Sequence, residues 1–271
     1  DAFLLSAARY TLGSAALCLM VAIADRRMPR LRVLPWGRIM ACGFAAGLFV
    51  TLATVALLFS DPITVSALFA AAPLVAALMA RMEQHARLSP PIVVGIVAAV
   101  GGGILVALGQ PGDMRLRGGE ALVIVALMVW TWYSMKTQRW LAPVGLTQLQ
   151  ITATTLACAT LLLWIASAGV LVLGAVSVPR AWPPMAATAA MLWLAAGPTA
   201  TAIALWNFGN SRVGVTVATL TINLAPVFSV LIAVVFGYLP TMLQILGGAV
   251  VLGGVVWMQL ALMRRRAHRL P

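Results

Sequence analysis

Charged side chains are scarce in this sequence, and acidic side chains are the scarcest. Only 9% of the 271 residues are charged, and 18 Lys and Arg residues outnumber 6 Asp and Glu residues. A soluble domain needs a larger charged fraction to keep its surface hydrated. This shortage, with 62% hydrophobic residues and a mean hydropathy of +1.02, excludes a soluble globular protein.

Reactive and metal-binding side chains are also few. Cys18, Cys42 and Cys158 fall in apolar runs, where cysteine acts as a small buried hydrophobe. His85 and His268 fall in a connection and in the tail. No metal-ligand spacing, nucleophile motif or phosphate-binding loop is present. The sequence therefore predicts no cofactor, no metal and no enzymatic activity.

Long apolar runs, by contrast, fill most of the chain. A helix that crosses a bilayer needs about 20 mostly apolar residues. The predicted spans are 2–24, 36–59, 62–80, 91–109, 118–139, 143–169, 183–209, 213–236 and 241–263. Because these runs lack the alternating polarity of barrel strands, the predicted fold class is all-α integral membrane, in one membrane domain.

The basic residues predict how these spans are oriented. If residue 1 lies outside, only Arg9, Arg115, Arg117 and Arg180 of the 18 basic residues fall on the outer side. The positive-inside rule then places the C-terminus in the cytoplasm of a multi-pass protein of the cell (inner) membrane. The tail cluster of Arg264–Arg266 and Arg269 is interpreted as an anchor on anionic lipid, not as a nucleic-acid site.

Features of the first part of the chain recur 153 positions later. The matching pairs are Ala72-Pro73 with Ala225-Pro226, Gly95 with Gly248, and Gly101 with Gly254. The two proline-containing spans run in opposite directions, which predicts an inverted repeat, as in many secondary transporters. The predicted repeats are 1–117 and 118–271. Because the first contains one span fewer, the offset places a further helix before residue 1, so that the intact protein would have two inverted repeats of five transmembrane helices.

Three stretches of the second half have a recognisable order and spacing. They are Gly118-Gly119-Glu120 with Met128-Val129-Trp130, Tyr133 and Arg139; Leu205-Trp206-Asn207 through Arg212; and Leu224-Ala225-Pro226-Val227-Phe228 with Gly247-Gly248 and Gly253-Gly254. Together they resemble the EamA-type branch of the drug/metabolite transporter superfamily, over nearly the whole chain. The stretch Trp206-Asn207-Phe208-Gly209 is similar to one in YddG-type aromatic amino acid exporters. The resemblance implies ten helices, a central cavity shared by both repeats, and export of small metabolites such as amino acids.

Polar and aromatic residues at helical spacing are the candidate substrate-binding residues. The candidates are Thr216, Thr219 and Asn223 on one span, Thr199, Trp206 and Asn210 on the span before it, and Trp130 with Ser134 on the fifth. Each set shares one face of a helix. One interpretation is a cavity wall whose aromatic rings suit an apolar or aromatic substrate. The alternatives are interhelical hydrogen bonds, ordinary packing, or, for Trp130 and Tyr133, an interfacial aromatic belt.

Two further pairs of residues suggest movement. Pro73 and Pro226 lie mid-span, where proline removes a hydrogen bond and kinks a helix. They are interpreted as gating hinges, with static kinks as the alternative. Arg9, about two turns inside the first span, and Asp61, in a connection on the same side, are candidates for a gate-closing pair. The alternative is that Arg9 extends to the lipid headgroups.

The sequence therefore predicts a secondary transporter that exports small metabolites by alternating access around a central cavity. Amino acids, aromatic or otherwise apolar, are first among the candidate substrates. The expected partners are this small-molecule substrate and membrane lipids. Exchange or facilitated diffusion is favoured over proton coupling through a buried carboxylate, because the spans contain almost no acids. The alternative is a non-transporting membrane component such as a lipid-handling enzyme.

Overall fold

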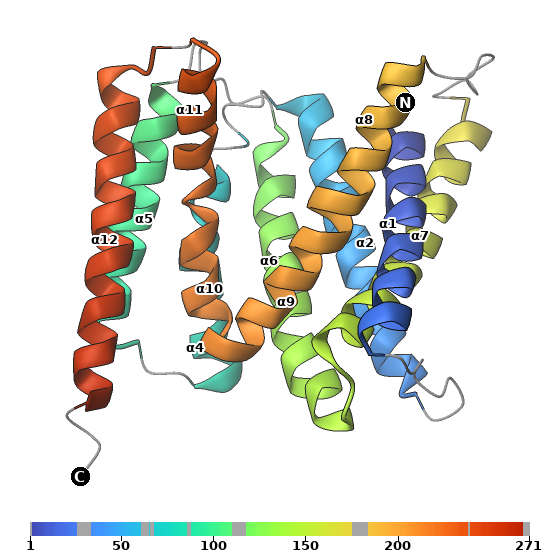
Figure 1. Cartoon of the computed structure of the whole chain (residues 1–271), viewed down its shortest axis with the longest axis horizontal. Helices are drawn as coiled ribbons and strands as arrows, with labels where there is room; N and C mark the ends of the chain where they lie inside the picture. The colour runs from blue at the N-terminus through green and yellow to red at the C-terminus, as the bar shows by residue number, and fades with distance from the viewer. Residues whose placement is uncertain are drawn as a thin grey trace. The chain divides into compact units, whose positions relative to one another are not determined.

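The computed structural model describes residues 2–25, 34–60, 65, 68–85, 88–109, 118–174, 184–237 and 239–267, and these are helical apart from turns and short connections (Figure 1). The helices are α1 (Ala2–Ala24), α2 (Trp36–Phe59), α4 (Ala72–Gln84), α5 (Pro90–Leu108), α6 (Glu120–Lys136), α7 (Gln148–Val172), α8 (Met185–Leu194), α9 (Ala202–Val213), α10 (Val215–Ile222), α11 (Ala225–Val235) and α12 (Met242–Ala267). Two π-helical segments, η2 (Thr137–Leu141) and η4 (Ala195–Thr201), and one 3₁₀ turn, η3 (Ala142–Val144), join some of them. No β-strand occurs in the described ranges.

Six helical stretches of the described chain are long and apolar enough to cross a membrane. They are α1, α2, α5, α7, the continuous stretch Met185–Val213, and Met242–Ala261 of α12. Long, exposed apolar side chains such as Leu19, Val97 and Trp193 cover their outer faces, as lipid requires. The chain is therefore a multi-pass, all-helical membrane protein.

The described helices overlap the predicted spans, although α7 begins at Gln148 and not at 143, and two of the spans are interrupted by turns. The span predicted at 62–80 lies partly outside the described residues, and its described portion turns at Ala70 and Ala71 before α4 begins. The span predicted at 213–236 is divided into α10 and α11 by a turn at Asn223 and Leu224. Both interruptions come directly before an Ala-Pro pair, which shows how strongly proline disfavours a continuous helix here.

The chain forms two compact units, each drawn from separate stretches of sequence. Unit 1 consists of residues 1–54 and 132–213, and unit 2 of residues 55–131 and 214–271. This division groups residues by contact, and it takes residues from both predicted repeats into each unit. The repeat boundary between residues 117 and 118 therefore stays a prediction.

In unit 1, α7 packs along both α1 and α2. The indole of Trp164 donates to Thr11 Oγ1 at 3.0 Å, and the hydroxyls of Ser14 and Thr160 lie 3.0 Å apart, so α1 and α7 are antiparallel. Gly43 brings α2 against α7 so closely that a Cβ there would lie 2.6 Å from the carbonyl oxygen of Thr155. Small residues at such contacts let helix backbones approach within a membrane.

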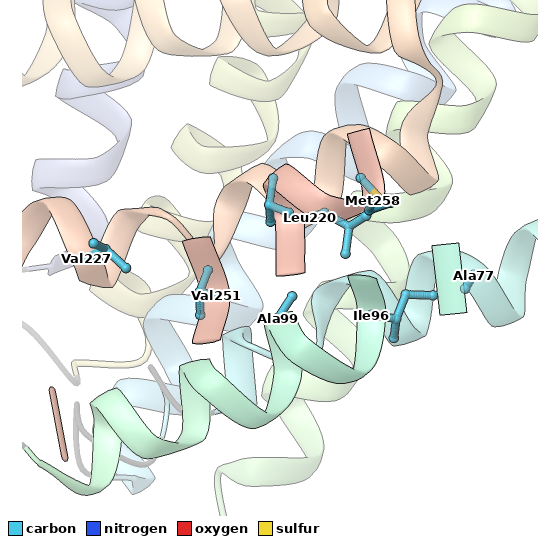
Figure 2. Close-up of a cluster of buried hydrophobic side chains, with 8 residues drawn as sticks. Ala77, Ile96, Ala99, Leu220, Val227, Val251 and Met258 are labelled. Atoms are coloured by element: carbon cyan, nitrogen blue, oxygen red, sulfur yellow. The ribbon is translucent and has the colours of Figure 1, made fainter. Parts of the chain in front are cut away.

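In unit 2, α5 and α12 form a close antiparallel pair (Figure 1). Gly95 faces Met258 near one end of the pair, and Gly109 faces Thr241 near the other. Between them, a Cβ on Gly102 would lie 2.6 Å from the carbonyl oxygen of Gly247. A buried apolar cluster joins this pair to α4, α10 and α11 (Figure 2), and its members are Ala77, Ile96, Ala99, Leu220, Val227, Val251, Val255 and Met258.

Candidate substrate-binding site

A network of buried polar side chains connects α6, α7 and α9 within unit 1. We call it the unit 1 polar network, and its members are Tyr133, Ser134, Thr152, Thr155, Trp206 and Asn207. All except Trp206 are at most 1% exposed. Because a polar group buried within a membrane protein is costly unless it is bonded, the network is the strongest candidate for a functional centre in this unit.

Asn207 lies at the centre of this network. Its amide nitrogen donates to the hydroxyl of Tyr133 and to Oγ1 of Thr152, both at 2.9 Å. The Tyr133 hydroxyl lies 3.3 Å from Oγ1 of Thr155. One residue earlier on α9, the indole of Trp206 donates to Oγ of Ser134 at 3.0 Å. Two neighbouring residues of α9 are thereby bonded to two neighbouring residues of α6.

Irregular helix geometry borders the network on two sides. The segment η2 begins at Thr137, directly after α6, and η4 ends at Thr201, directly before α9. Pro198 lies inside η4, where its missing N–H and its ring prevent regular α-helical bonding. Widened turns of this kind are frequent at functional sites in helical proteins.

The network extends toward the start of α7 through two glutamines. Nε2 of Gln138 lies 3.2 Å from both Oε1 of Gln148 and the carbonyl oxygen of Asn207. At the N-cap of α7, Thr147 accepts from the backbone of Gln150 and donates to Oδ2 of Asp25 at 2.6 Å. This capping arrangement stabilises the first turn of α7 and fastens it to the end of α1.

The structure brings some of the predicted residues of unit 1 into this region. Ser134 and Trp206 belong to the network itself. Asn210 is 2% exposed, and neither atom of its amide has a hydrogen-bond partner among the described residues. Thr199 is different, because its hydroxyl donates to the carbonyl of Leu194 in its own helix and its methyl group faces Gly13 of α1.

The remaining predicted residues belong to unit 2. Trp130 is half-buried on α6. Thr219 is fully buried and donates to the carbonyl of Thr216, within the same helix. Asn223 is 2% exposed, and its amide nitrogen donates to the carbonyl of Ala70 at 2.8 Å. On the predicted polar face of this helix, the side chains of Thr219 and Asn223 therefore donate hydrogen bonds to backbone carbonyls.

The two helix interruptions of unit 2 have matching backbone hydrogen bonds. Around Pro73, Ala71 N donates to Leu68 O at 2.9 Å and Val75 N donates to Ala71 O at 3.1 Å. Around Pro226, Leu224 N donates to Thr221 O at 3.1 Å and Phe228 N donates to Leu224 O at 2.9 Å. Each bond of the second set lies 153 residues after its counterpart. The sequence predicted two kinks, and the structure contains two similar breaks.

The predicted gate pair is described only in part. Asp61 lies outside the described residues, so its pairing with Arg9 stays a prediction. Arg9 is half-buried on α1, its Nε is buried without a hydrogen-bond partner among the described residues, and its guanidinium lies 5.5 Å from the ring centroid of Tyr10. Its side chain is thus held partly within the protein.

Tyr133, Thr152, Thr155 and Asn207 are not among the site residues that the sequence predicts. An interfacial belt was one interpretation of Tyr133, but its side chain is 1% exposed and bonded to two neighbouring helices. One signal was present, since Asn207 and Asn210 are three residues apart and share a face of one helix. The partners of Asn207 lie 74 and 55 residues away in sequence, so only tertiary structure identifies them.

The chain is similar to a named protein and to solved structures. No family model matches the chain. A probable terminal-alkyne amino-acid exporter of Streptantibioticus cattleyicolor is 28% identical over 266 residues, which are 97% of this chain and 85% of that protein. A crystal structure of a protein 21% identical in sequence superposes with a TM-score of 0.80, over 97% of this chain and 88% of the other.

The solved structure shows that the two chains share a fold. The named relative is described as a transporter and not as an enzyme, which agrees with the expectation that this chain is not an enzyme. Together with the apolar helices, the comparisons establish a multi-pass helical membrane protein that is similar in sequence to an amino-acid exporter.

Proposed function

We propose that this protein is a secondary transporter that exports small metabolites, with amino acids, aromatic or otherwise apolar, as the first candidates. The observation that carries the proposal is the similarity to a probable amino-acid exporter over nearly the whole chain. The buried unit 1 polar network adds to it, because hydrogen-bonding groups are expensive within a membrane and usually serve function. A polar substrate needs such groups in order to leave water.

We further propose the EamA-type plan of ten helices in two inverted repeats, 1–117 and 118–271. Two observations support it. The helix breaks before Pro73 and Pro226 share their bonding pattern at an offset of 153 residues. The predicted counterparts α5 and α12 pack antiparallel. Antiparallel counterparts are what an inverted repeat requires.

The proposed mechanism is alternating access to a central cavity. Pro73 and Pro226 serve as hinges, because each break leaves fewer helix hydrogen bonds to resist bending. The proposed substrate-binding residues are Trp130, Ser134, Thr199, Trp206, Asn210, Thr216, Thr219 and Asn223, and we add Asn207 because of its place at the centre of the unit 1 polar network. The described acids lie at helix ends, at Asp25, Glu83 and Glu120, which favours exchange or facilitated diffusion over coupling through a mid-membrane carboxylate.

We also propose residence in the inner membrane with the C-terminus in the cytoplasm. The support is the bias of basic residues, which follows the positive-inside rule. A reporter that fluoresces only in the cytoplasm, fused after residue 271, would be bright under this topology. A dark but correctly inserted fusion would contradict it.

Uptake into proteoliposomes tests the transport function directly. Purified full-length chain is reconstituted, and the accumulation of radiolabelled L-phenylalanine, L-norleucine, L-propargylglycine, L-lysine and 2-phenylethylamine is compared with that in protein-free vesicles. We expect saturable transport of at least one apolar amino acid. Absence of transport for all the amino acids, by protein shown to be folded, would contradict the amino-acid assignment.

A further inference from the structure

The hydrogen bonds around Asn207 determine which way its amide faces. Oγ1 of Thr152 donates its single proton to the carbonyl oxygen of Gln148 at 2.7 Å. A hydroxyl has one proton, so Thr152 must accept at its 2.9 Å contact with Asn207. The group of Asn207 that faces Thr152 is therefore the NH₂ group, and the network itself assigns the amide orientation.

The bond to Tyr133 leads to the same assignment. Oγ1 of Thr155 donates to the carbonyl oxygen of Ile151 at 2.8 Å, so it accepts from the Tyr133 hydroxyl. The Tyr133 oxygen then accepts the second proton of the Asn207 amide, at 2.9 Å. Both amide protons of Asn207 are used within the protein. Its side-chain oxygen is buried, points away from these bonds and has no partner among the described residues.

Asn210 presents a second unpartnered amide on the same face of α9. It lies three residues after Asn207, which places the two side chains side by side along the helix. Both Oδ1 and Nδ2 of Asn210 are buried without a hydrogen-bond partner among the described residues, and the side chain is 2% exposed. Whichever way this amide is turned, it offers one acceptor and one donor group.

Three unpartnered polar groups therefore lie together on α9, two acceptors and one donor. A buried amide that bonds to nothing lowers stability, and such groups in folded proteins call for an explanation. An ammonium group has three protons to donate and accepts none, whereas a carboxylate only accepts. An α-amino acid carries both groups on one carbon atom and matches this set of atoms.

We propose that Asn207 and Asn210 bind the zwitterionic head of an α-amino acid. The α-ammonium donates to the two side-chain oxygens, and the Asn210 NH₂ group donates to the α-carboxylate. This inference rests on the proposed function and specifies how its substrate is recognised. Tyr133 and Thr152 are positioning residues, since they hold the Asn207 oxygen toward the ligand without touching it.

The surrounding charges suit recognition by neutral groups. The only carboxylate in the described part of unit 1 is that of Asp25, which accepts from Thr147 at the start of α7. The ammonium is therefore bonded by uncharged oxygens, and its charge is balanced by the carboxylate of the same molecule. A site of this kind favours zwitterions over bare amines or bare acids. Because its atoms are buried, the ligand reaches them only when adjacent helices separate, as alternating access requires.

Two substitutions at Asn210 test the proposal, with Ser211→Ala as the matched control. The control removes an exposed side chain on the next residue, which bonds the carbonyl of Phe208 in its own helix. Asn210→Leu keeps a similar size and removes the unpartnered amide. Asn210→Asp replaces the donor to the carboxylate with a negative oxygen. Each variant is assayed in proteoliposomes for the transported amino acid and for 2-phenylethylamine, and its melting temperature is measured in detergent.

For Asn210→Leu, we expect transport of the amino acid at low concentration to fall about tenfold or more, with a melting temperature equal to or above that of the unmodified protein. For Asn210→Asp, we expect the ratio of amine to amino-acid transport to rise about tenfold, because the acid now repels the carboxylate and attracts the ammonium. Ser211→Ala should leave both quantities unchanged.

The proposal is overturned if Asn210→Leu transports the amino acid normally. It is also overturned if that variant melts at a markedly lower temperature, which would mean that Asn210 is bonded within the protein, or if Asn210→Asp leaves the substrate ratio unchanged. If the leucine variant cannot be produced in amounts that allow a melting measurement, the substrate ratio of Asn210→Asp decides the matter. If the unmodified protein transports no amino acid, the proposed function has failed, and that result is distinct from unaltered transport by the variants.

Discussion

The side-chain amide of Asn223 donates a 2.8 Å hydrogen bond to the backbone carbonyl of Ala70, a residue 153 positions earlier. The same offset separates Pro73 from Pro226 and relates the two helix breaks. In a regular helix the Ala70 carbonyl would accept from Leu74 N, but here Leu74 N donates to the Ala71 carbonyl at 3.0 Å. Asn223 thus satisfies a carbonyl that the first break exposes, at the position equivalent to its own. In the proposed inverted repeat, a contact between equivalent positions would lie close to the two-fold axis.

Loss of the Asn223 bond should destabilise the protein. Asn223→Ala leaves the buried Ala70 carbonyl without this donor, which we expect to cost about 1 kcal/mol of unfolding free energy. Thermal or denaturant unfolding in detergent measures it. Thr221→Val is the control, since the Thr221 hydroxyl bonds the Ala218 carbonyl in its own helix. Equal destabilisation by both variants would contradict a specific role for the bond.

Neighbouring glycines of α5 should respond in opposite ways to alanine. A Cβ on Gly102 would lie 2.6 Å from the Gly247 carbonyl and 2.7 Å from the Val251 side chain, whereas a Cβ on Gly101 meets nothing within 4 Å. We expect Gly102→Ala to destabilise the protein by about 1–3 kcal/mol. Gly101→Ala should be neutral or stabilise it by up to about 1 kcal/mol, because alanine favours helix. Melting curves that rank the two variants the other way would refute the close packing of α5 and α12.

The Trp206–Ser134 bond should appear as energetic coupling. Trp206→Phe and Ser134→Ala each remove one partner, and the double variant removes both. We expect the double variant to be about 0.6 kcal/mol more stable than the sum of the single effects predicts, and at most about 1.7 kcal/mol. Unfolding of the four proteins provides the double-mutant cycle. Strict additivity would show that the 3.0 Å contact contributes nothing.

Alanine at the two prolines should stiffen the broken helices. Pro73→Ala and Pro226→Ala each restore a backbone N–H, so we expect unchanged or higher melting temperatures. If the breaks are hinges, transport should slow, about tenfold for the double variant. Pro90→Ala, at the first position of α5 where proline is tolerated, is the control. Full transport activity in the double variant would assign the prolines a static role.

Charge reversal tests the proposed gate. Arg9→Asp and Asp61→Arg should each reduce transport, because each places two like charges at the gate. The double reversal should recover most of the activity, since the opposite charges are restored. Uptake assays with matched protein amounts measure this. If the double variant recovers nothing, Arg9 and Asp61 do not form a pair.

The sequence by itself determined that this protein lies in a membrane and where most of its helices fall. Apolar runs of about 20 residues leave no alternative to membrane helices, because lipid cannot satisfy backbone hydrogen bonds. The two mid-span Ala-Pro pairs predicted both helix breaks, because proline removes a hydrogen bond from the helix in which it lies. Ser134, Trp206 and Asn210 were candidates because polar and aromatic residues recur there at helical spacing, and their role in binding stays a prediction.

Tertiary structure alone decided which polar side chains share a network. Tyr133, Thr152 and Asn207 come from three helices, and no spacing along the sequence relates them. It also separated Thr199 and Thr219, whose hydroxyls bond nearby backbone carbonyls, from Asn207 and Asn210, which have amide atoms without a partner among the described residues. That distinction depends on which acceptor each donor proton bonds. A hydrogen bond forms only between atoms within about 3 Å of one another, and folding decides which atoms those are.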